Sequence, residues 1–341
     1  MTNTTSAGEP AVLRLRTPHD VIAAVPYLLG FHPAGSLVAI GAEGPQGTCA
    51  LRLDLPPAEH VDAAADQLAT VLVGNGFPRA VLVGYGGPAL VEPIVAAARA
   101  ALAVRGVEVL ETLRVDGGRF WTCGCTVPAC CPPEGTPYDI STSPVAAQAT
   151  VAGRVALSDR GALARSVAPV TGLAREAMRR ARTRAERRFI DRMVGSPDPT
   201  AALARMVEEG VAYVRGLPPR ELTDDEVAWL GVVLMHPEVR DEALAHTGAD
   251  RLDLWRDVLR RIDERFAAAP ACLTAYAAYL AGDGALANVA LDRAVAADPD
   301  YLMATLLRDI ILTGVPPATL RRHICPQPSP DTRDDRTGPP P

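Results

Sequence analysis

The feature that most constrains this chain is a change in its hydrophobic periodicity near residue 150. Before that point, short aliphatic runs alternate with longer segments whose apolar residues recur at helical spacing. After it, only the helical spacing continues. The first pattern is typical of an α/β layer structure and the second of an all-α unit. The 341 residues therefore predict two units, each long enough to bury its own core.

The first unit, residues 11–150, is expected to form a mixed or mostly parallel sheet covered by helices. Thr17 and Pro18 suit the start of the first helix, and Pro26 is expected to kink that helix or end it early. Strands are predicted at 13–16, 36–42, 49–55, 79–87, 107–115 and 119–123, and helices at 17–31, 58–76 and 89–106.

The second unit, residues 151–325, is expected to contain about seven helices. Thr223 and Glu226 have the spacing of a capping box at one helix start. Other predicted helical segments are 173–194, 199–216, 237–246 and 252–269, followed by a helical pair at 271–301. The polar segments 1–10 and 326–341 have the composition of disordered chain ends.

The pair at 271–301 resembles one tetratricopeptide-type repeat, with Gly282 at the turn and Pro299 at the end of the second helix. Stacked repeats of this type form grooves for peptides, which favours a protein-interaction surface. A single copy also fits an ordinary helical hairpin inside a bundle. Both interpretations stay open.

Charge and hydropathy restrict the compartment and the partners. The formal charge is −6, so the surface as a whole does not suit nucleic-acid binding, although all 34 basic residues are arginine. The start of the chain lacks a secretory pattern, and the apolar runs are shorter than the roughly 18 residues of a membrane span. We expect a cytoplasmic protein, in which cysteines are thiols or metal ligands more often than disulfides.

Four cysteines, Cys123, Cys125, Cys130 and Cys131, lie within nine residues. Thiolates are good zinc ligands, but two adjacent cysteines strain the backbone when both bind one tetrahedral ion. Pairing across the cluster would instead give a redox-responsive site. Buried structural thiols in a proline-rich loop are the third interpretation.

Two loops at the strand ends are candidate ligand sites. Gly84, Gly86 and Gly87 lie between a strand and a helix, where backbone amides can hold an anion. His32 and Ser36 lie in a loop that leads into a strand and could line a pocket. The glycines lack the complete dinucleotide-binding pattern, and Ser36 is not in a nucleophile elbow. An enzyme is therefore less favoured than a non-catalytic role.

The segment 175–188 carries seven arginines in fourteen residues. Arg179, Arg180, Arg187 and Arg188 are candidates for contact with nucleic acid or an acidic partner. Because glutamates interrupt the charge and no aromatic platform accompanies it, a solvated helix between the two units is also consistent with the pattern.

Three blocks of the sequence resemble an actinobacterial family known as domain of unknown function 4192: TPHDVIAAVPYLLGFHPAGSLVAIG (17–41), FWTC…CCPPEGTPYD (120–139) and GDGALANVALDRAVAADPDY (282–301). The resemblance spans most of residues 11–325. It implies one long family unit and carries no established activity. The residues themselves favour a regulatory or adaptor protein, with a ligand-, thiol- or metal-responsive α/β unit and a helical unit that binds a protein partner. An enzyme using the loops at one sheet end and a nucleic-acid-associated protein are the alternatives.

Overall fold

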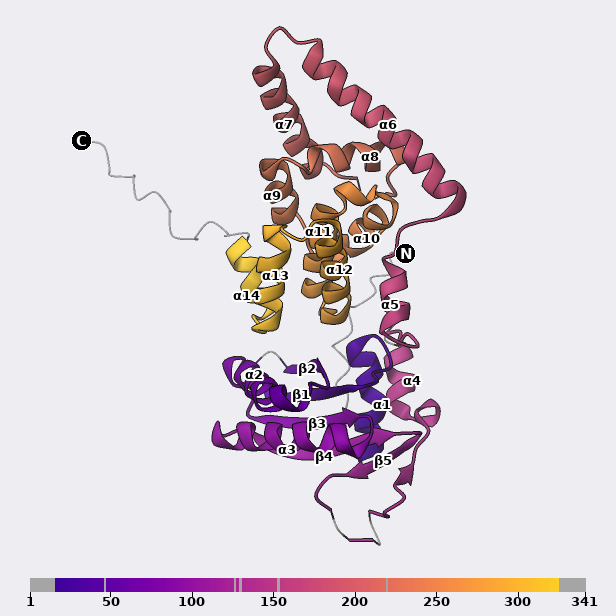
Figure 1. The fold of residues 1–341 in the computed structure, drawn as a ribbon, viewed down its shortest axis with the longest axis vertical. Coiled ribbons are helices and arrows are strands. Elements are labelled where there is room, and N and C mark those ends of the chain that lie inside the picture. The colour runs from indigo at the N-terminus through magenta and orange to yellow at the C-terminus, as the bar shows by residue number, and fades with distance from the viewer. Residues whose placement is uncertain are drawn as a thin grey trace, which may run out of the picture.

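The computed structural model describes residues 16–45, 47–125, 127–128, 131–151, 154–218 and 220–324. Within these ranges the strands all precede residue 138, and only helices follow (Figure 1). This confirms the predicted fold class, a mixed α/β unit followed by an all-α unit. The segments 1–10 and 326–341, and nearly all of the strand expected at 13–16, lie outside the described residues. The domain boundaries 11–150 and 151–325 stay predictions. We call residues 16–151 the α/β half and residues 154–324 the helical half.

Six strands form one sheet in the order β2-β1-β3-β4-β5-β6. Their bounds are β1 Ser36–Gly44, β2 Gly47–Asp54, β3 Arg79–Tyr85, β4 Glu108–Asp116, β5 Arg119–Thr122 and β6 Thr136–Pro137. Among these strands only β3 and β4 pair in parallel, so the sheet is mixed and the mostly parallel alternative is wrong. Tight hairpins join β1 to β2 and β4 to β5, and such turns can connect only antiparallel strands.

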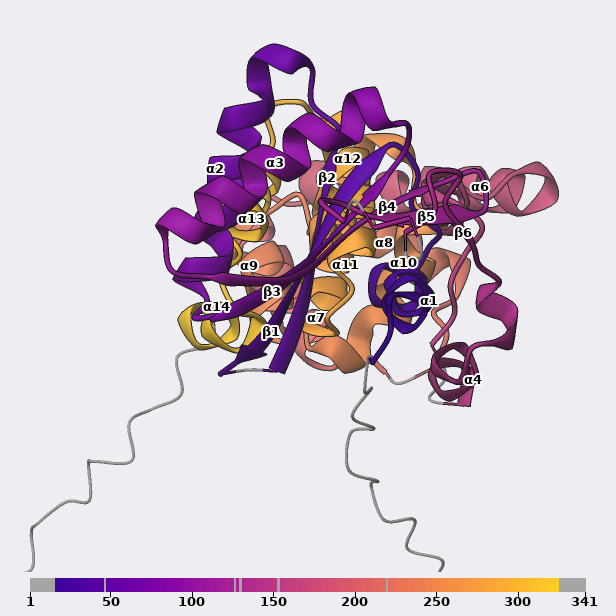
Figure 2. The ribbon, with the colours of Figure 1, turned by 90° about the horizontal axis from the view of Figure 1, so that it is seen from below.

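Helices cover both faces of this sheet (Figure 2). Leu37, Ala39 and Leu82 face α2 (Val61–Gly74) and α3 (Pro88–Val104). The residues next to these in each strand, such as Val38 and Val83, point to the other face of the sheet and face α1 (Pro18–Leu29). α4 (Pro144–Val151) packs against the outer side of α1. The two-residue alternation along each strand thus buries apolar side chains on both sides.

The first helix begins as expected but does not end at its internal proline. Thr17 and Asp20 form a capping box, and Gly30 ends the helix with a φ of 78°. Pro26 is buried within α1, which continues to Leu29. A proline removes one helical hydrogen bond, and burial of the surrounding apolar face offsets that loss here.

The helical half is built around α11, which is buried along nearly its whole length. Its neighbours in space include α9, α10, α12, α13 and α14 (Figure 1). The helices of this half are α5 Arg160–Ser166, α6 Gly172–Val194, α7 Pro199–Arg215, α8 Asp224–Val233, α9 Pro237–Ala245, α10 Leu252–Arg261, α11 Ala268–Leu280, α12 Gly284–Ala297, α13 Leu302–Leu312 and α14 Pro317–Ile324. The expectation of about seven helices is too low. Short helices such as α5 and α14 show little hydrophobic periodicity in the sequence, and they were not predicted.

One predicted helix, 252–269, is divided in the structure. Ile262 takes an extended conformation at the end of α10, and Asp263 then caps a short 3-10 turn before α11 begins. No helix in the described part of the chain has both the length and the apolar character needed to cross a membrane.

The two halves are in contact, and one core cluster contains buried side chains of both. The backbone N–H of Leu157 donates to Gly30, and the N–H of His32 donates back to Leu157. On the other side, Gly314 lies so close to α2 that an added Cβ would be 2.5 Å from Val71. These contacts position the sheet relative to the helices.

Candidate functional site

The cysteine cluster follows β5. Backbone N–H groups of Cys123, Cys125 and Cys131 donate to Thr112, Thr122 and Val127, respectively. Cys130 lies outside the described residues. Among the described residues no group of three or more His, Cys, Asp or Glu side chains is arranged to hold a metal ion. The zinc and redox hypotheses for this cluster stay predictions.

Burial raises the pKa of the Cys123 thiol, while the nearby Arg114 and Arg99 lower it and Glu92 raises it. Burial also raises the pKa of Cys49 to about 11 and that of Cys272 to about 12. A thiol with a raised pKa is protonated at neutral pH and is a poor nucleophile. This favours a structural role for Cys49 and Cys272.

The loop that follows the cluster is fastened to β5 by two side chains. The Trp121 indole donates to the Pro133 carbonyl at 2.9 Å, and the Arg119 guanidinium donates to the Gly135 carbonyl at 2.7 Å. Gly135 has a φ of 79°, and an added Cβ would lie 2.5 Å from the Trp121 ring. In the FWTC…CCPPEGTPYD block, Trp121 therefore packs directly on Gly135, and a side chain at position 135 would collide with the ring.

Sequence reasoning missed Arg114, which is adjacent to this loop. It lies on β4 opposite Trp121 in β5 and is only 8% exposed. Its guanidinium stacks on the Trp121 ring at 3.6 Å from the centroid. The available signal was an arginine inside the strand pattern VEVLETLRV, three residues before the hairpin glycines.

At the end of the sheet, the structure brings Ser36 beside the glycine segment. Ser36 pairs with Tyr85 across β1 and β3, and both hydroxyl oxygens are buried without a hydrogen-bond partner among the described residues. His32 is exposed, and no hydrogen bond joins its side chain to Ser36. A serine nucleophile needs a base within hydrogen-bond reach, so this arrangement gives no support to a hydrolase.

The three candidate glycines have different roles. Gly84 allows α3 to approach β3, because an added Cβ would lie 2.2 Å from Val91. Gly86 adopts a φ of 143° and donates its N–H to Val115. Only Gly87, at the start of α3, has open space around it. Gly84 and Gly86 are therefore explained by packing and turn geometry, without a ligand.

None of these candidates lines one of the two best-formed hollows of the described residues. Both hollows are shallow and open. One is bounded by Ala96, Arg99, Ala100, Ala103, Val107, Glu108 and Val109, and the other by Ala63, Asp66, Gln67, Thr70, Val71, Leu312 and Thr313. Ligand sites of enzymes are usually deeper, so these hollows do not favour catalysis.

The repeat-like pair corresponds to α11 and α12. All residues from Ala268 to Ala278 in α11 are buried, as is most of the inner face of α12. The pair therefore forms the core of the helical half and leaves no open groove along α11. A protein-interaction surface in this half has to lie on its outer helices.

The arginines of α6 divide into two sets. On the inner side, Arg182, Arg184 and Arg192 form ion pairs with Asp263, Asp225 and Glu209 at 2.5, 2.7 and 2.6 Å, respectively. These ion pairs connect α6 to the 3-10 turn before α11, to α8 and to α7. They hold α6 against the rest of the helical half.

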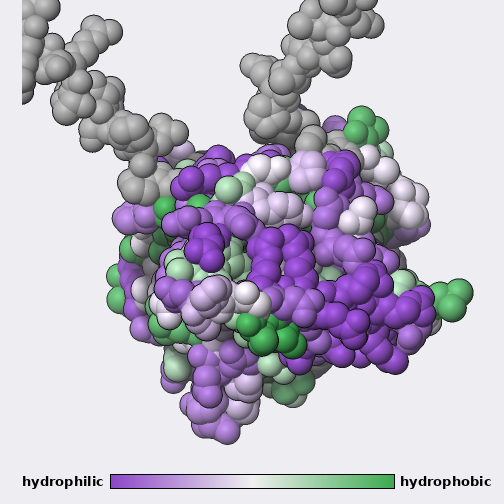
Figure 3. Space-filling model, turned by 90° about the horizontal axis from the view of Figure 1, so that it is seen from above, coloured by the Kyte–Doolittle hydropathy of each residue, from purple (hydrophilic) through white to green (hydrophobic). Residues whose placement is uncertain are grey.

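On the outer side of α6, Arg179 and Arg180 share one carboxylate, Glu176, at 3.1 and 3.7 Å. Arg188 lies at the border of the two sides, because it stacks on the buried Trp229 ring at 4.0 Å, over which Arg192 also lies. Arg187 is exposed and has no ion pair among the described residues. The end of the molecule formed by α6 and α7 is mainly hydrophilic, with hydrophobic side chains in separate spots (Figure 3). Positive charge on this side is only partly neutralised.

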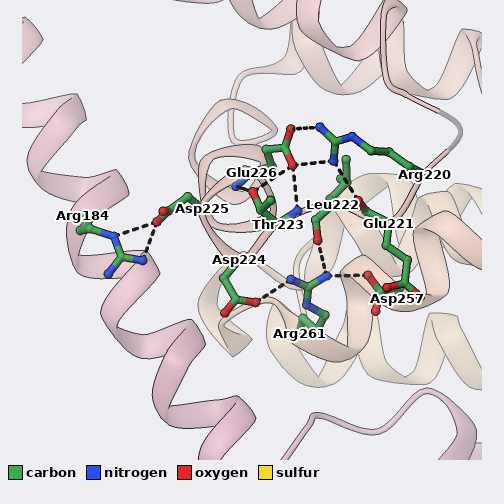
Figure 4. A network of polar contacts seen from close by, with 10 residues as sticks. All are labelled: Arg184, Arg220, Glu221, Leu222, Thr223, Asp224, Asp225, Glu226, Asp257 and Arg261. Carbon is green, nitrogen blue, oxygen red and sulfur yellow. Dashed lines mark hydrogen bonds and ion pairs between the residues drawn. The ribbon is translucent and has the colours of Figure 1, made fainter.

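A polar network fixes the start of α8 (Figure 4). Three consecutive acids each bind an arginine from a different element: Asp224 binds Arg261, Asp225 binds Arg184 and Glu226 binds Arg220. Glu226 also accepts from the backbone N–H of Thr223, as the capping box predicted. The network joins α6, α8, α10 and the segment before α8.

Acidification is expected to weaken this network. The hydrogen bond from Arg220 lowers the pKa of Glu226 to about 2. A lowered pKa in the folded state stabilises the protein above the unfolded pKa of about 4.3, and this stabilisation is lost as pH falls toward 2. Denaturation midpoints measured between pH 7 and pH 2 should therefore fall less steeply for Glu226→Gln than for the native chain. Glu208→Gln, an exposed change on α7, should keep the native slope.

These features define a class of protein: a helix-covered mixed sheet joined to a closed helical bundle, with no catalytic set assembled among the described candidates. The chain belongs to the family described as "Domain of unknown function (DUF4192)", whose model matches residues 18–318. No curated protein and no solved structure matches the chain. The family assignment confirms the resemblance found in the three sequence blocks.

Proposed function

We propose that this protein is a cytoplasmic adaptor that binds an acidic segment of another protein along the outer face of α6. The observation that carries this proposal is the division of the α6 arginines. The inner set is fully used to fix the helix, and the outer set exceeds the carboxylates available to it. An excess of fixed positive charge on an exposed helix favours association with a complementary acidic surface.

Exposed apolar side chains accompany these arginines. Ile190 and Val194 are 54% and 80% exposed and lie four residues apart, on one side of the helix. A partner helix with both acidic and apolar residues could therefore pair carboxylates with Arg187 and bury its apolar side chains on Ile190 and Val194. This combination resembles the anchors of helix-on-helix recognition.

A protein partner fits this face better than nucleic acid. Glu176 and Asp191 interrupt the positive charge along the helix, and the whole chain carries a formal charge of −6. Trp229, the nearest large ring, is only 8% exposed and lies beneath Arg188. It offers no free surface for a base to stack on.

Site-specific photo-cross-linking tests the location of the contact. A photo-reactive residue at exposed Thr183 on α6 should capture a partner in cells, and one at exposed Thr305 on α13 should not. The captured protein is then purified, and its affinity is measured for the native chain and for a variant with Arg179, Arg180, Arg187 and Arg188 changed to glutamate. We expect affinity to fall at least tenfold and to weaken with added salt, since the contacts are largely electrostatic.

A matched variant controls for net charge. It carries glutamate at four exposed arginines away from α6: Arg154, Arg165, Arg321 and Arg322. This variant should keep native affinity. Equal loss in both variants would contradict the α6 surface. Because Arg188 also packs on Trp229, a second variant changes only Arg179, Arg180 and Arg187. Salt-sensitive binding of duplex DNA or RNA that only the α6 variants abolish would replace the protein partner with nucleic acid.

A further inference from the structure

We propose that Arg114 and Arg99 form a binding site for a tetrahedral oxyanion, a phosphate group, on the α3 side of β4 and β5. This site is separate from the α6 surface and does not depend on the adaptor function. It lies where the chain leaves β5 at Thr122 (Figure 1).

The first argument is the burial of a cation without a strong partner. Arg114 is only 8% exposed, and its one ion pair with a described residue is long. Its nearest carboxylate, Asp116, is 4.0 Å away and half exposed. A buried charge is costly unless hydrogen bonds and an opposite charge compensate it. A bound anion would supply both.

The second argument is that the guanidinium is held in place. Trp121 lies under it, and the Trp121 indole is itself fixed by its hydrogen bond to Pro133 and by the close approach of Gly135. Stacking on a ring leaves the edge of the guanidinium and its N–H groups available. A fixed planar fork of this type suits the two oxygens of a phosphate group.

The third argument is a second arginine at the same place. Arg99 on α3 reaches the loop, because its Nη1 is 3.4 Å from the position that a Cβ on Gly124 would occupy. Arg99 and Arg114 both act on the Cys123 thiol, so the thiol lies within the electric field of both guanidinium groups. Glu92, seven residues before Arg99 on α3, is the acid that also acts on this thiol.

Register explains why the neighbouring strands supply no acceptor for Arg114. Arg114 lies beside Gly84 in β3, which has no side chain, and its side chain is on the same side of the sheet as Trp121 and Cys123. Because one neighbour lacks a side chain and the other is a flat ring, neither supplies an acceptor for the guanidinium. The side chains next to Arg114 on this side of the sheet are therefore a ring and a thiol, and an oxyanion is the type of ligand that the free guanidinium edge would bind.

Two probes test the site: inorganic phosphate and adenosine monophosphate, each compared with sodium chloride at equal ionic strength. Binding is followed by tryptophan fluorescence, because Trp121 lies directly under Arg114. We expect a saturable change that chloride does not produce, and slower alkylation of Cys123 as phosphate is added. A response to phosphate alone would identify free phosphate as the ligand, and tighter binding of the monophosphate would identify a phosphoester.

Variants separate this proposal from a purely structural arginine. Arg99→Gln, at an exposed position that leaves the stacked pair intact, should weaken phosphate binding about tenfold or more, because it removes a charge-assisted contact. Arg114→Lys keeps the charge but loses the fork and should weaken it further. Arg105→Gln, at the end of the same helix, is the control and should bind normally. A chloride-like response in the native chain, or unchanged binding in Arg99→Gln and Arg114→Lys, would overturn the proposal.

Discussion

Replacing Trp255 with alanine is expected to lower the free energy of unfolding by about 3–5 kcal/mol, the range for removing a large buried aromatic side chain. Trp255 lies on α10, is 1% exposed and packs within the same core cluster as α11. Its indole donates to the Thr247 hydroxyl at 2.8 Å, so the substitution also leaves that buried hydroxyl without its donor. Both losses act on the core of the helical half.

Chemical denaturation followed by circular dichroism measures this effect. Trp255→Phe keeps most of the ring volume and loses only the hydrogen bond and part of the contact, so its cost should be clearly smaller. Trp229→Phe is less suitable as a control, because it also removes the ring under Arg188. If Trp255→Ala cost about 1 kcal/mol or less, as surface substitutions do, Trp255 would not be part of a closed core.

The sequence was most informative where a local signal and a packing requirement agree. The helix start at Thr17 and the capping box at Thr223 were predicted because a cap depends on residues that are close in the sequence. Strands β1 and β2 were predicted at 36–42 and 49–55 because turn residues separate two apolar runs. The direction of strand pairing was not, because it depends on contacts between segments far apart in the sequence. The pairing of β1 with β3 is an example, since β2 and α2 lie between them.

The candidate sites show the same limit. Patterns of glycine, histidine and cysteine predicted candidate sites, but the structure explains Gly84 by its contact with α3. Arg114 was missed because its importance comes from burial beside Trp121 on the next strand, and its place in the pattern VEVLETLRV does not show which face of the strand is covered there. The same holds for the α6 arginines. Their residue type was evident, but only the structure separates those that anchor the helix from those that face solvent.

Gly84→Ala is the second substitution with a large expected effect. Its Cβ would lie 2.2 Å from the Val91 Cγ1, so α3 would have to move away from β3. Added atoms in a well-packed core typically cost about 1–3 kcal/mol, and the larger Gly84→Val should cost more. Gly84 does not have a positive φ, so the cost comes from contact and not from backbone strain. Equilibrium unfolding in urea measures it.

A double-mutant cycle shows whether that contact is the cause. Val91→Ala removes the methyl group that an alanine at 84 would meet, at a cost of about 1–2 kcal/mol for lost burial. The double variant should then be at least about 1 kcal/mol more stable than the sum of the two single changes predicts. Gly74→Ala, in a helix where an added Cβ meets nothing within 4 Å, is the control and should be neutral or slightly stabilising. Additive single changes would instead mean that Gly84 is required for some reason other than the approach of α3, and the hypothesis of an anion-binding loop at 84–87 would have to be considered again.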